Sequence, residues 1–262
     1  MSLVRSAVRQ VWPRVAAVAG LVLLWWLVYR SGYFSPVVLP SPLDVWRSIG
    51  RNIANGKITR ATEASLGRLL IGFTLSVVSG TLIGLLMVAS KSIERSVGSL
   101  IIGLQSLPSI AWLPLAILWF GLGESAVLFV VVIGSLPSVA LATLNSLRQV
   151  PPLLERAGRT LGAKGWRLYR HVVFPASIPG YVGGLQQGWA FAWRSLMAGE
   201  LIIGGSLGLG QLLNFSRENL DTPLVLGVMV MIVIIGMTVD LAVFGVLDRR
   251  IRSRRGLLLA SE

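Results

Sequence analysis

The stretch at residues 125–147, SAVLFVVVIGSLPSVALATLNSL, contains 23 residues without a charged side chain and lies between Glu124 and Arg148. The hydrocarbon core of a bilayer is about 30 Å thick, and about 20 apolar residues of α-helix cross it. A helix also satisfies its own backbone hydrogen bonds, as a segment surrounded by lipid must. This stretch therefore predicts a membrane-spanning helix.

Five other stretches lack charged residues and have similar lengths. They are 15–29, 69–90, 96–123, 172–193 and 222–239. The first holds only 15 residues, but Arg14 and Arg30 at its ends can extend their charged groups to the interface. An alternative for residues 1–30 is a secretory signal peptide, but no cleavage site of the A-x-A type follows the apolar core. We therefore expect about six transmembrane helices.

The composition agrees with this interpretation. Hydrophobic residues make up 54% and charged residues 13% of the 262 residues, whereas about a quarter of the residues in a soluble domain are charged. The composition therefore excludes a soluble domain. We predict an all-α, polytopic membrane protein in which residues 1–262 form a single transmembrane domain.

The positive charges are distributed unequally between the two sides of the membrane. If both termini are cytoplasmic, 16 Lys and Arg residues lie inside and five lie outside. Positive charge favours cytoplasmic loops, so we expect a multi-pass protein of the cell's inner membrane with both termini in the cytoplasm. The formal net charge of +13 then reflects topology and does not indicate nucleic acid binding.

In this orientation three segments lie outside, and two of them have an informative pattern. Residues 31–67 form an outer loop, in which Val45, Ile49 and Ile53 recur every four residues and predict an amphipathic helix. That helix could lie on the outer surface or pack against the bundle. The second segment, residues 204–221, is expected to be irregular and flexible because of its glycines. They are Gly204, Gly205, Gly208 and Gly210.

The inner loop at residues 148–175 has the pattern of two short helices. Pro152 favours a helix start, and an apolar residue then occupies every fourth position. These residues are Leu153, Ala157 and Leu161. Gly162 follows, where a left-handed residue commonly ends a helix. A second helical pattern covers 166–173, and we expect Phe174-Pro175 to stop it.

Small side chains in this loop allow another backbone to approach closely. They are Ala157, Gly158, Gly162 and Ala163. We interpret residues 148–175, called the knob below, as a docking site for a partner that receives helices in a groove. The alternative is a solvated loop that caps the neighbouring spans.

The knob resembles the cytoplasmic signature of permease subunits in binding-protein-dependent ABC importers, E-A-A-x3-G-x9-I-x-L-P. With Gly162 at the glycine, the I, L and P positions hold Val172, Phe174 and Pro175. The E-A-A positions hold Arg156, Ala157 and Gly158. The leading Glu is thus absent, and the acidic residue is one place earlier, at Glu155. The resemblance implies that ATPase coupling involves Glu155, Arg156, Ala157, Gly158, Gly162, Ala163 and Pro175.

Other segments resemble the taurine, aliphatic-sulfonate and nitrate branch of this family. They are Leu39-Pro40-Ser41-Pro42, Ser65-Leu66-Gly67-Arg68, Pro114-Leu115-Ala116-Ile117-Leu118-Trp119-Phe120-Gly121 and Trp193-Arg194. The resemblance implies a type I ABC importer permease fold in which two copies, as a homodimer, form the pathway. It also implies two cytoplasmic ATPase subunits, an external substrate-binding protein and a small anionic substrate, sulfonate first and nitrate second.

The sequence shows no pattern for chemistry of its own. It has no cysteine, and its one histidine, His171, has no acidic residue nearby, so no metal site is predicted. The phosphate-binding pattern G-x-x-x-x-G-K-[ST] is absent, since Ile58 follows the only Gly-Lys pair, Gly56-Lys57. We therefore expect a transport subunit and not an enzyme, with no bound cofactor. ATP and Mg would be bound by the partner ATPase.

Charged residues within a membrane span are costly and face protein or a wet cavity. Arg194 and Glu200 are six residues apart, which places them about 120° apart around a helix, so we do not expect them to pair with each other. Our hypothesis is that Arg194 provides positive potential for an anion, while Trp189 and Trp193 shape the passage. The alternative is an interhelical salt bridge that holds this span in place.

Pro108 and Pro114 interrupt the stretch at 96–123, so it should border a cavity. The alternative is a kinked packing helix. The predicted pathway residues are Gln105, Ser109, Trp112, Trp189, Trp193, Arg194 and Glu200. The rival function is a secondary transporter driven by an ion gradient, which predicts inverted repeats and an acidic residue near the bilayer midplane. No convincing repeat is present, and Asp240 lies near the inner interface.

Overall fold

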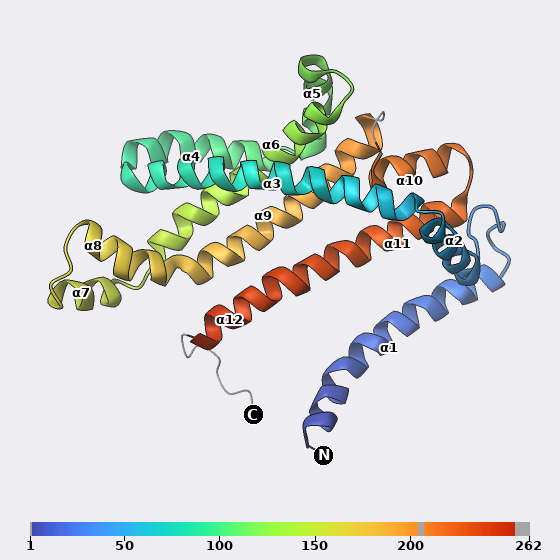
Figure 1. The fold of residues 1–262 in the computed structure, drawn as a ribbon, viewed down its shortest axis with the longest axis horizontal. Helices are drawn as coiled ribbons and strands as arrows, with labels where there is room; N and C mark the ends of the chain where they lie inside the picture. Colours follow the sequence, from blue (N-terminus) through green and yellow to red (C-terminus); the bar gives the residue numbers. More distant parts are fainter. Residues whose placement is uncertain (1, 204–206, 255–262) are drawn as a thin grey trace. The chain divides into compact units, whose positions relative to one another are not determined.

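The computed structural model describes residues 2–203 and 207–254, and the regular elements in these residues are helical (Figure 1). The α-helices are α1 (Ser2–Arg30), α2 (Pro42–Ala54), α3 (Lys57–Ala89), α4 (Lys91–Ser106), α5 (Leu113–Phe120), α6 (Glu124–Arg148), α7 (Pro152–Thr160), α8 (Trp166–Leu168), α9 (Phe174–Ile203), α10 (Leu209–Glu218), α11 (Thr222–Val239) and α12 (Val246–Arg254). The other helical elements in the described residues are a 3-10 turn, η1 (Ser109–Trp112), and two π-helical segments, η2 (Tyr169–Val173) and η3 (Asp240–Gly245). The expected all-α class is confirmed.

The six stretches expected to span the membrane are helical but differ in how well they suit a bilayer. By length and apolarity, α3, α6 and the helix from Thr222 to Ile251 are each able to cross it. In α1, the apolar part is the shorter segment Val15–Arg30. In α9, Gln186 and Gln187 lie in the middle of the expected span and make it less apolar.

The expected span at 96–123 is not one continuous helix. α4 ends at Ser106, η1 begins at Ser109, and the two parts are bent by 97°. Pro108 lies at the break and has no backbone N–H to continue the helical hydrogen bonds. The expected span is therefore broken into two helices, and the predicted interruption of the helix by proline is confirmed.

Contacts divide the chain into two compact units, which we describe separately. The first unit comprises Met1–Arg60 and Leu212–Met231, and the second comprises Ala61–Gln211 and Ile232–Glu262. In the first unit, Val45 and Ile49 of α2 are buried, and Ile49 lies against Gly227 of α11. Ile53, the third residue of the predicted apolar stripe, is exposed.

The second unit is built around α6 and α9, which pack side by side (Figure 1). Small residues permit their close approach, because a Cβ at Gly184 of α9 would collide with Ala142 of α6. On the other side of α6, a Cβ at Gly84 of α3 would lie 2.7 Å from the carbonyl oxygen of Ala140. Small residues at such crossings bring helix backbones together in membranes. The resulting core positions the groups described below.

Candidate functional site

The knob consists of α7, α8 and η2, which lie at the end of α6 and α9 (Figure 1). Pro152 is in the first turn of α7. Backbone N–H groups in the first turn form no hydrogen bond within the helix, so a proline, which has no N–H, is tolerated there. Gly162 follows the helix with φ +85°, a left-handed conformation that favours glycine. The N–H of Ala163 then donates to the carbonyl oxygen of Gly158 at 3.0 Å and closes the turn.

Phe174-Pro175 does not stop the second helix of the knob, contrary to the prediction. Helical structure continues from α8 through η2 directly into α9. The π-helical turn at Tyr169–Val173 ends two residues before the proline, so the regular hydrogen-bond pattern is already interrupted close to the point where Pro175 lacks an N–H.

Gly158 faces the interior of the knob. Its position is buried, and a Cβ there would lie 2.9 Å from both Leu168 Cδ1 and Val172 Cγ2. Leu168 and Val173 are themselves buried against Leu147 at the end of α6. The predicted use of Gly158 to admit a partner's backbone is therefore wrong, because the glycine allows α7 to contact α8 and η2.

The apolar stripe of α7 faces outward instead. Leu153 is 74% exposed and Leu161 87% exposed, and Ala157 between them is also exposed. On the same helix Glu155 pairs with Arg159 at 3.7 Å, and Arg156 is exposed. The knob thus has exposed leucines on its surface. The charged residues beside them include one ion pair, between Glu155 and Arg159.

The residues predicted to border a cavity near the broken span meet α6 and α9. The Ser195 hydroxyl of α9 donates to the Ser109 hydroxyl of η1 at 2.8 Å. The Trp112 ring packs edge-on against Phe129 of α6, with centroids 6.5 Å apart. Gln105 near the end of α4 is half-buried.

The predicted pathway residues of α9 have different environments. The Trp189 ring contacts Phe73 of α3 edge-on at 5.4 Å, and the Trp193 indole lies against Gly236. Both tryptophans are therefore packed within the second unit. Arg194 is exposed, and its guanidinium lies 5.3 Å from the centroid of the Phe191 ring.

Glu200 lies in an ion cluster that contains Ser65, Arg68, Glu124 and Glu200; of these four residues, Glu124 is exposed and the others are buried. Glu200 is 2% exposed, and its carboxylate accepts hydrogen bonds from Arg68 at 2.8 Å and from the Ser65 hydroxyl at 2.7 Å. Arg68, 7% exposed, also pairs with Glu124 of α6 at 3.0 Å. For Glu200, the interhelical salt bridge is thus the interpretation that the structure supports.

The ion cluster also fixes the start of α10. The N–H of Gly210 donates to Glu200 at 3.0 Å, and the N–H of Leu209 donates to the Ser65 hydroxyl at 2.8 Å. Anions are favoured at a helix N-terminus because its first N–H groups have no helical partner. A Cβ at Gly208 would lie 2.5 Å from the Glu200 carboxylate, so glycine is required there by space.

The expectation of an irregular segment at 204–221 is therefore wrong for Leu209–Glu218, which form α10. Gly204 and Gly205 lie outside the described residues. Sequence reasoning missed Ser65 and Arg68 as partners of Glu200. One signal was present in the sequence: Arg68 is a charged residue at the border of the apolar stretch 69–90, and Ser65, with a hydroxyl group, lies three residues before it.

Comparisons with known proteins place this arrangement in a family. Residues 73–253 match the model of the binding-protein-dependent transport system inner membrane component. The chain is 28% identical to the taurine transport system permease protein TauC of Escherichia coli, over 95% of this chain and 91% of that protein. It is 33% identical to the riboflavin transport system permease protein RibX of Chloroflexus aurantiacus, over 94% of this chain and 92% of that protein.

A solved structure has the same fold. An inward-facing structure of the MetNI methionine ABC transporter matches with a TM-score of 0.64 and 22% identity, over 74% of this chain and 96% of that one. The family model covers most of the chain, including the knob and the ion cluster's Glu124 and Glu200. The chain belongs to the family of binding-protein-dependent transport system inner membrane components, the permease subunits of ABC importers.

Proposed function

We propose that this permease subunit imports a small organic anion, an aliphatic sulfonate such as taurine in preference to nitrate. The observation that carries this proposal is Arg194. It is exposed on α9, next to Trp193, and its guanidinium forms no ion pair within residues 2–203 and 207–254. A cation is costly in a membrane unless it meets an anion or water. The substrate would supply the negative charge.

The substrate class rests on this charge together with the relatives. TauC is by name a taurine transport permease, whereas RibX is a riboflavin transport permease. A guanidinium binds a sulfonate or carboxylate through two parallel N–H···O hydrogen bonds, which a neutral heterocycle does not offer. An exposed arginine beside the Phe191 ring therefore favours the sulfonate.

As a permease of this family, the chain is a transport subunit, and ATP hydrolysis belongs to a separate subunit. In our proposal two ATPase subunits, with ATP and Mg bound to them, dock on the knobs of a permease homodimer. An external binding protein delivers the substrate. The exposed leucines at 153 and 161 support the docking step, since apolar side chains on an aqueous surface are stabilised when a partner covers them.

Coupling would follow from the connection of the knob to α9. The knob joins α9 at Pro175 without a flexible linker, because helical structure is continuous there. Movement of a docked ATPase would therefore be transmitted to the helix that carries Arg194 and Trp193. Such rigid-body coupling would alternate access to the pathway, which also includes Gln105 and Trp112 in our proposal.

The test is transport by purified components in sealed vesicles. The permease, its ATPase and its binding protein are reconstituted, and uptake of labelled taurine is measured with ATP inside and outside in separate samples, against competing nitrate and riboflavin. We expect ATP-dependent uptake that alkanesulfonates compete for more strongly than nitrate does. The matched variant Arg194→Met should assemble normally and lose most uptake, while Arg194→Lys should retain part of it.

Three results would contradict the proposal. Taurine uptake driven by a proton or sodium gradient without the ATPase would restore the rival secondary transporter. Equal uptake by Arg194→Met and the unaltered permease would remove Arg194 from the pathway. If Arg194→Met failed to assemble with its ATPase, Arg194 would be a structural residue instead.

A further inference from the structure

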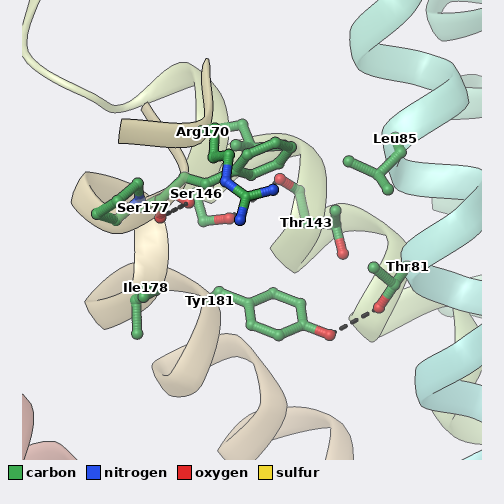
Figure 2. Close-up of a pocket in the computed structure, with 11 residues that line it drawn as sticks. Thr81, Leu85, Thr143, Ser146, Arg170, Ser177, Ile178 and Tyr181 are labelled. Atoms are coloured by element: carbon green, nitrogen blue, oxygen red, sulfur yellow. Dashed lines mark hydrogen bonds between the residues drawn. The ribbon is translucent and has the colours of Figure 1, made fainter. Parts of the chain in front are cut away.

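A cavity of about 270 Å³ lies in the second unit between α3, α6, η2 and the start of α9, on the side of the knob (Figure 2). It contains none of the proposed pathway residues and none of the ion cluster. Its lining is Thr81, Leu85, Thr143, Ser146, Leu147, Arg170, Phe174, Pro175, Ser177, Ile178 and Tyr181. The cavity therefore needs an explanation separate from transport through the pathway.

One charged group is directed into the cavity. Figure 2 shows the guanidinium of Arg170 in the space between Ser177, Thr143 and the ring of Tyr181. Among the described residues, Arg170 forms no ion pair, and no carboxylate lines this cavity. The guanidinium thus has its N–H donors available to a ligand.

A second donor comes from a pair of hydroxyls. The Thr81 hydroxyl and the Tyr181 hydroxyl are 2.7 Å apart, and one of them donates to the other. Two O–H groups have two hydrogens and only one is used in that bond, so the remaining one is available to the cavity. The hydroxyls of Ser146 and Ser177 already donate to backbone carbonyls.

The remaining walls are apolar. Leu85 comes from α3, Leu147 from α6, and Phe174 and Ile178 from α9. Arg170 is itself exposed, so a ligand can reach its guanidinium from outside the cavity. The walls also offer a surface on which an alkyl chain loses contact with water.

We propose that this cavity binds a phosphate group attached to an alkyl chain. The planar guanidinium of Arg170 matches two oxygens of a phosphate, and the Thr81–Tyr181 pair supplies a further donor. The alkyl chain lies against the apolar walls. Such a ligand has two sources, the headgroup of an anionic phospholipid or a free alkyl phosphate. The proposal does not depend on which substrate the permease imports.

The first experiment uses free ligands. The full-length permease, purified with its ATPase subunits, is placed in phosphatidylcholine nanodiscs, and the binding of ethyl, butyl and hexyl phosphate is measured by calorimetry. We expect affinity to rise about three- to fourfold for each added methylene. Arg170→Gln should weaken hexyl phosphate binding about tenfold, because it removes a charged hydrogen-bonding group. The matched control Arg167→Gln removes the same charge from the neighbouring turn, outside the cavity, and should change binding less than twofold.

The second experiment separates the two sources. The same nanodiscs are prepared with phosphatidic acid added, and native mass spectrometry records which lipids stay bound. If the lipid is the source, the complex retains phosphatidic acid, loses it in Arg170→Gln, and no longer binds hexyl phosphate while it is occupied. If the source is a free anion, hexyl phosphate binds in both preparations, and phosphatidic acid is not retained.

The proposal is overturned if neither ligand binds, or if binding is the same in Arg170→Gln and Arg167→Gln. It is also overturned if affinity does not change with alkyl chain length. Should Arg170→Gln fail to assemble, Ile178→Ala carries the test, since it shortens an exposed part of the wall. It should weaken hexyl phosphate about threefold and leave ethyl phosphate unchanged; equal effects on both would contradict the proposal.

Discussion

The ion cluster and the knob lie in the same unit, but they use their unusual side chains in opposite ways. In the cluster, the charges of Arg68 and Glu200 are buried and each oxygen or nitrogen meets a partner within the unit. In the knob, Leu153 and Leu161 are apolar and remain exposed. The cluster is therefore complete without another chain, whereas the knob has a surface that a partner would complete.

This difference predicts where substitutions act. Changes in the ion cluster should lower the stability of the permease itself, so that less folded permease is present to bind the ATPase. Changes on the exposed face of the knob, which carries Leu153 and Leu161, should leave the permease folded and weaken its contact with the ATPase. The following variants test that separation, beginning with the largest expected effect.

Arg68→Met should destabilise the permease by about 3–5 kcal/mol, because it leaves the buried Glu200 carboxylate without its cation. The measurement is the midpoint of thermal unfolding in detergent, together with the yield of assembled complex. The double variant Arg68→Met/Glu200→Gln should recover part of the loss, since no buried charge is then unpaired. A single variant as stable as the unaltered protein would show that the cluster does not hold these helices together.

Gly158→Ala should destabilise the knob by about 1–3 kcal/mol through overpacking, because the new methyl would meet Leu168 and Val172. The expected readout is faster proteolysis between α7 and α8, with the thermal midpoint of the whole permease lowered less than by Arg68→Met. The control is Ala157→Gly on the exposed face of the same helix, which should cost about 1 kcal/mol through helix propensity alone. If Gly158→Ala and the unaltered knob are cleaved by protease at the same rate, α7 can shift to accommodate the methyl group without loss of stability, and the prediction is contradicted.

Leu161→Asp should leave stability unchanged within about 0.5 kcal/mol, since the leucine is exposed. It should weaken ATPase binding about tenfold or more, because a charge would enter an apolar contact. The measurement is the affinity of purified ATPase for the permease in nanodiscs. Leu161→Met keeps the apolar volume and should bind normally. Undiminished binding by Leu161→Asp would place the contact elsewhere.

Glu124→Gln should have the smallest effect, about 0.5 kcal/mol on unfolding. Its side chain is 65% exposed, although it pairs with the same Arg68 as Glu200 does, and exposed ion pairs contribute little. Comparing its thermal midpoint with that of Glu200→Gln therefore separates burial from charge. A loss as large as that of Glu200→Gln would mean that the exposed pair matters as much as the buried one.

The sequence could predict elements whose signals are local. Uncharged stretches such as 125–147 predicted the helices. Pro108 predicted the break before η1, and Gly162 predicted the end of α7. It could not predict the orientation of Gly158, because the side of α7 that packs inward is decided by Leu168 and Val172. Pro175 was misjudged since a π-helical turn before it changes the local hydrogen-bond pattern.

The contacts of the candidate site were harder to predict because they join residues distant in sequence. Ser65 and Glu200 are 135 residues apart, and nothing in either segment identifies its partner. The segment after Glu200 was taken as irregular because of its glycines. In the structure, Gly208 and Gly210 are where the Glu200 carboxylate meets α10, so the same residues permit a close contact.

The central claim is that the exposed face of the knob, which carries Leu161, binds the ATPase. Its most direct test is cysteine labelling, because the chain has no cysteine of its own. Leu161→Cys and, as control, the exposed Leu43→Cys of α2 are each labelled with a maleimide in the presence and absence of purified ATPase. We predict that ATPase slows the labelling of Leu161→Cys at least about tenfold, as expected for a site occupied with micromolar affinity or better, and leaves Leu43→Cys unchanged. Equal labelling of Leu161→Cys with and without a bound ATPase would contradict the claim.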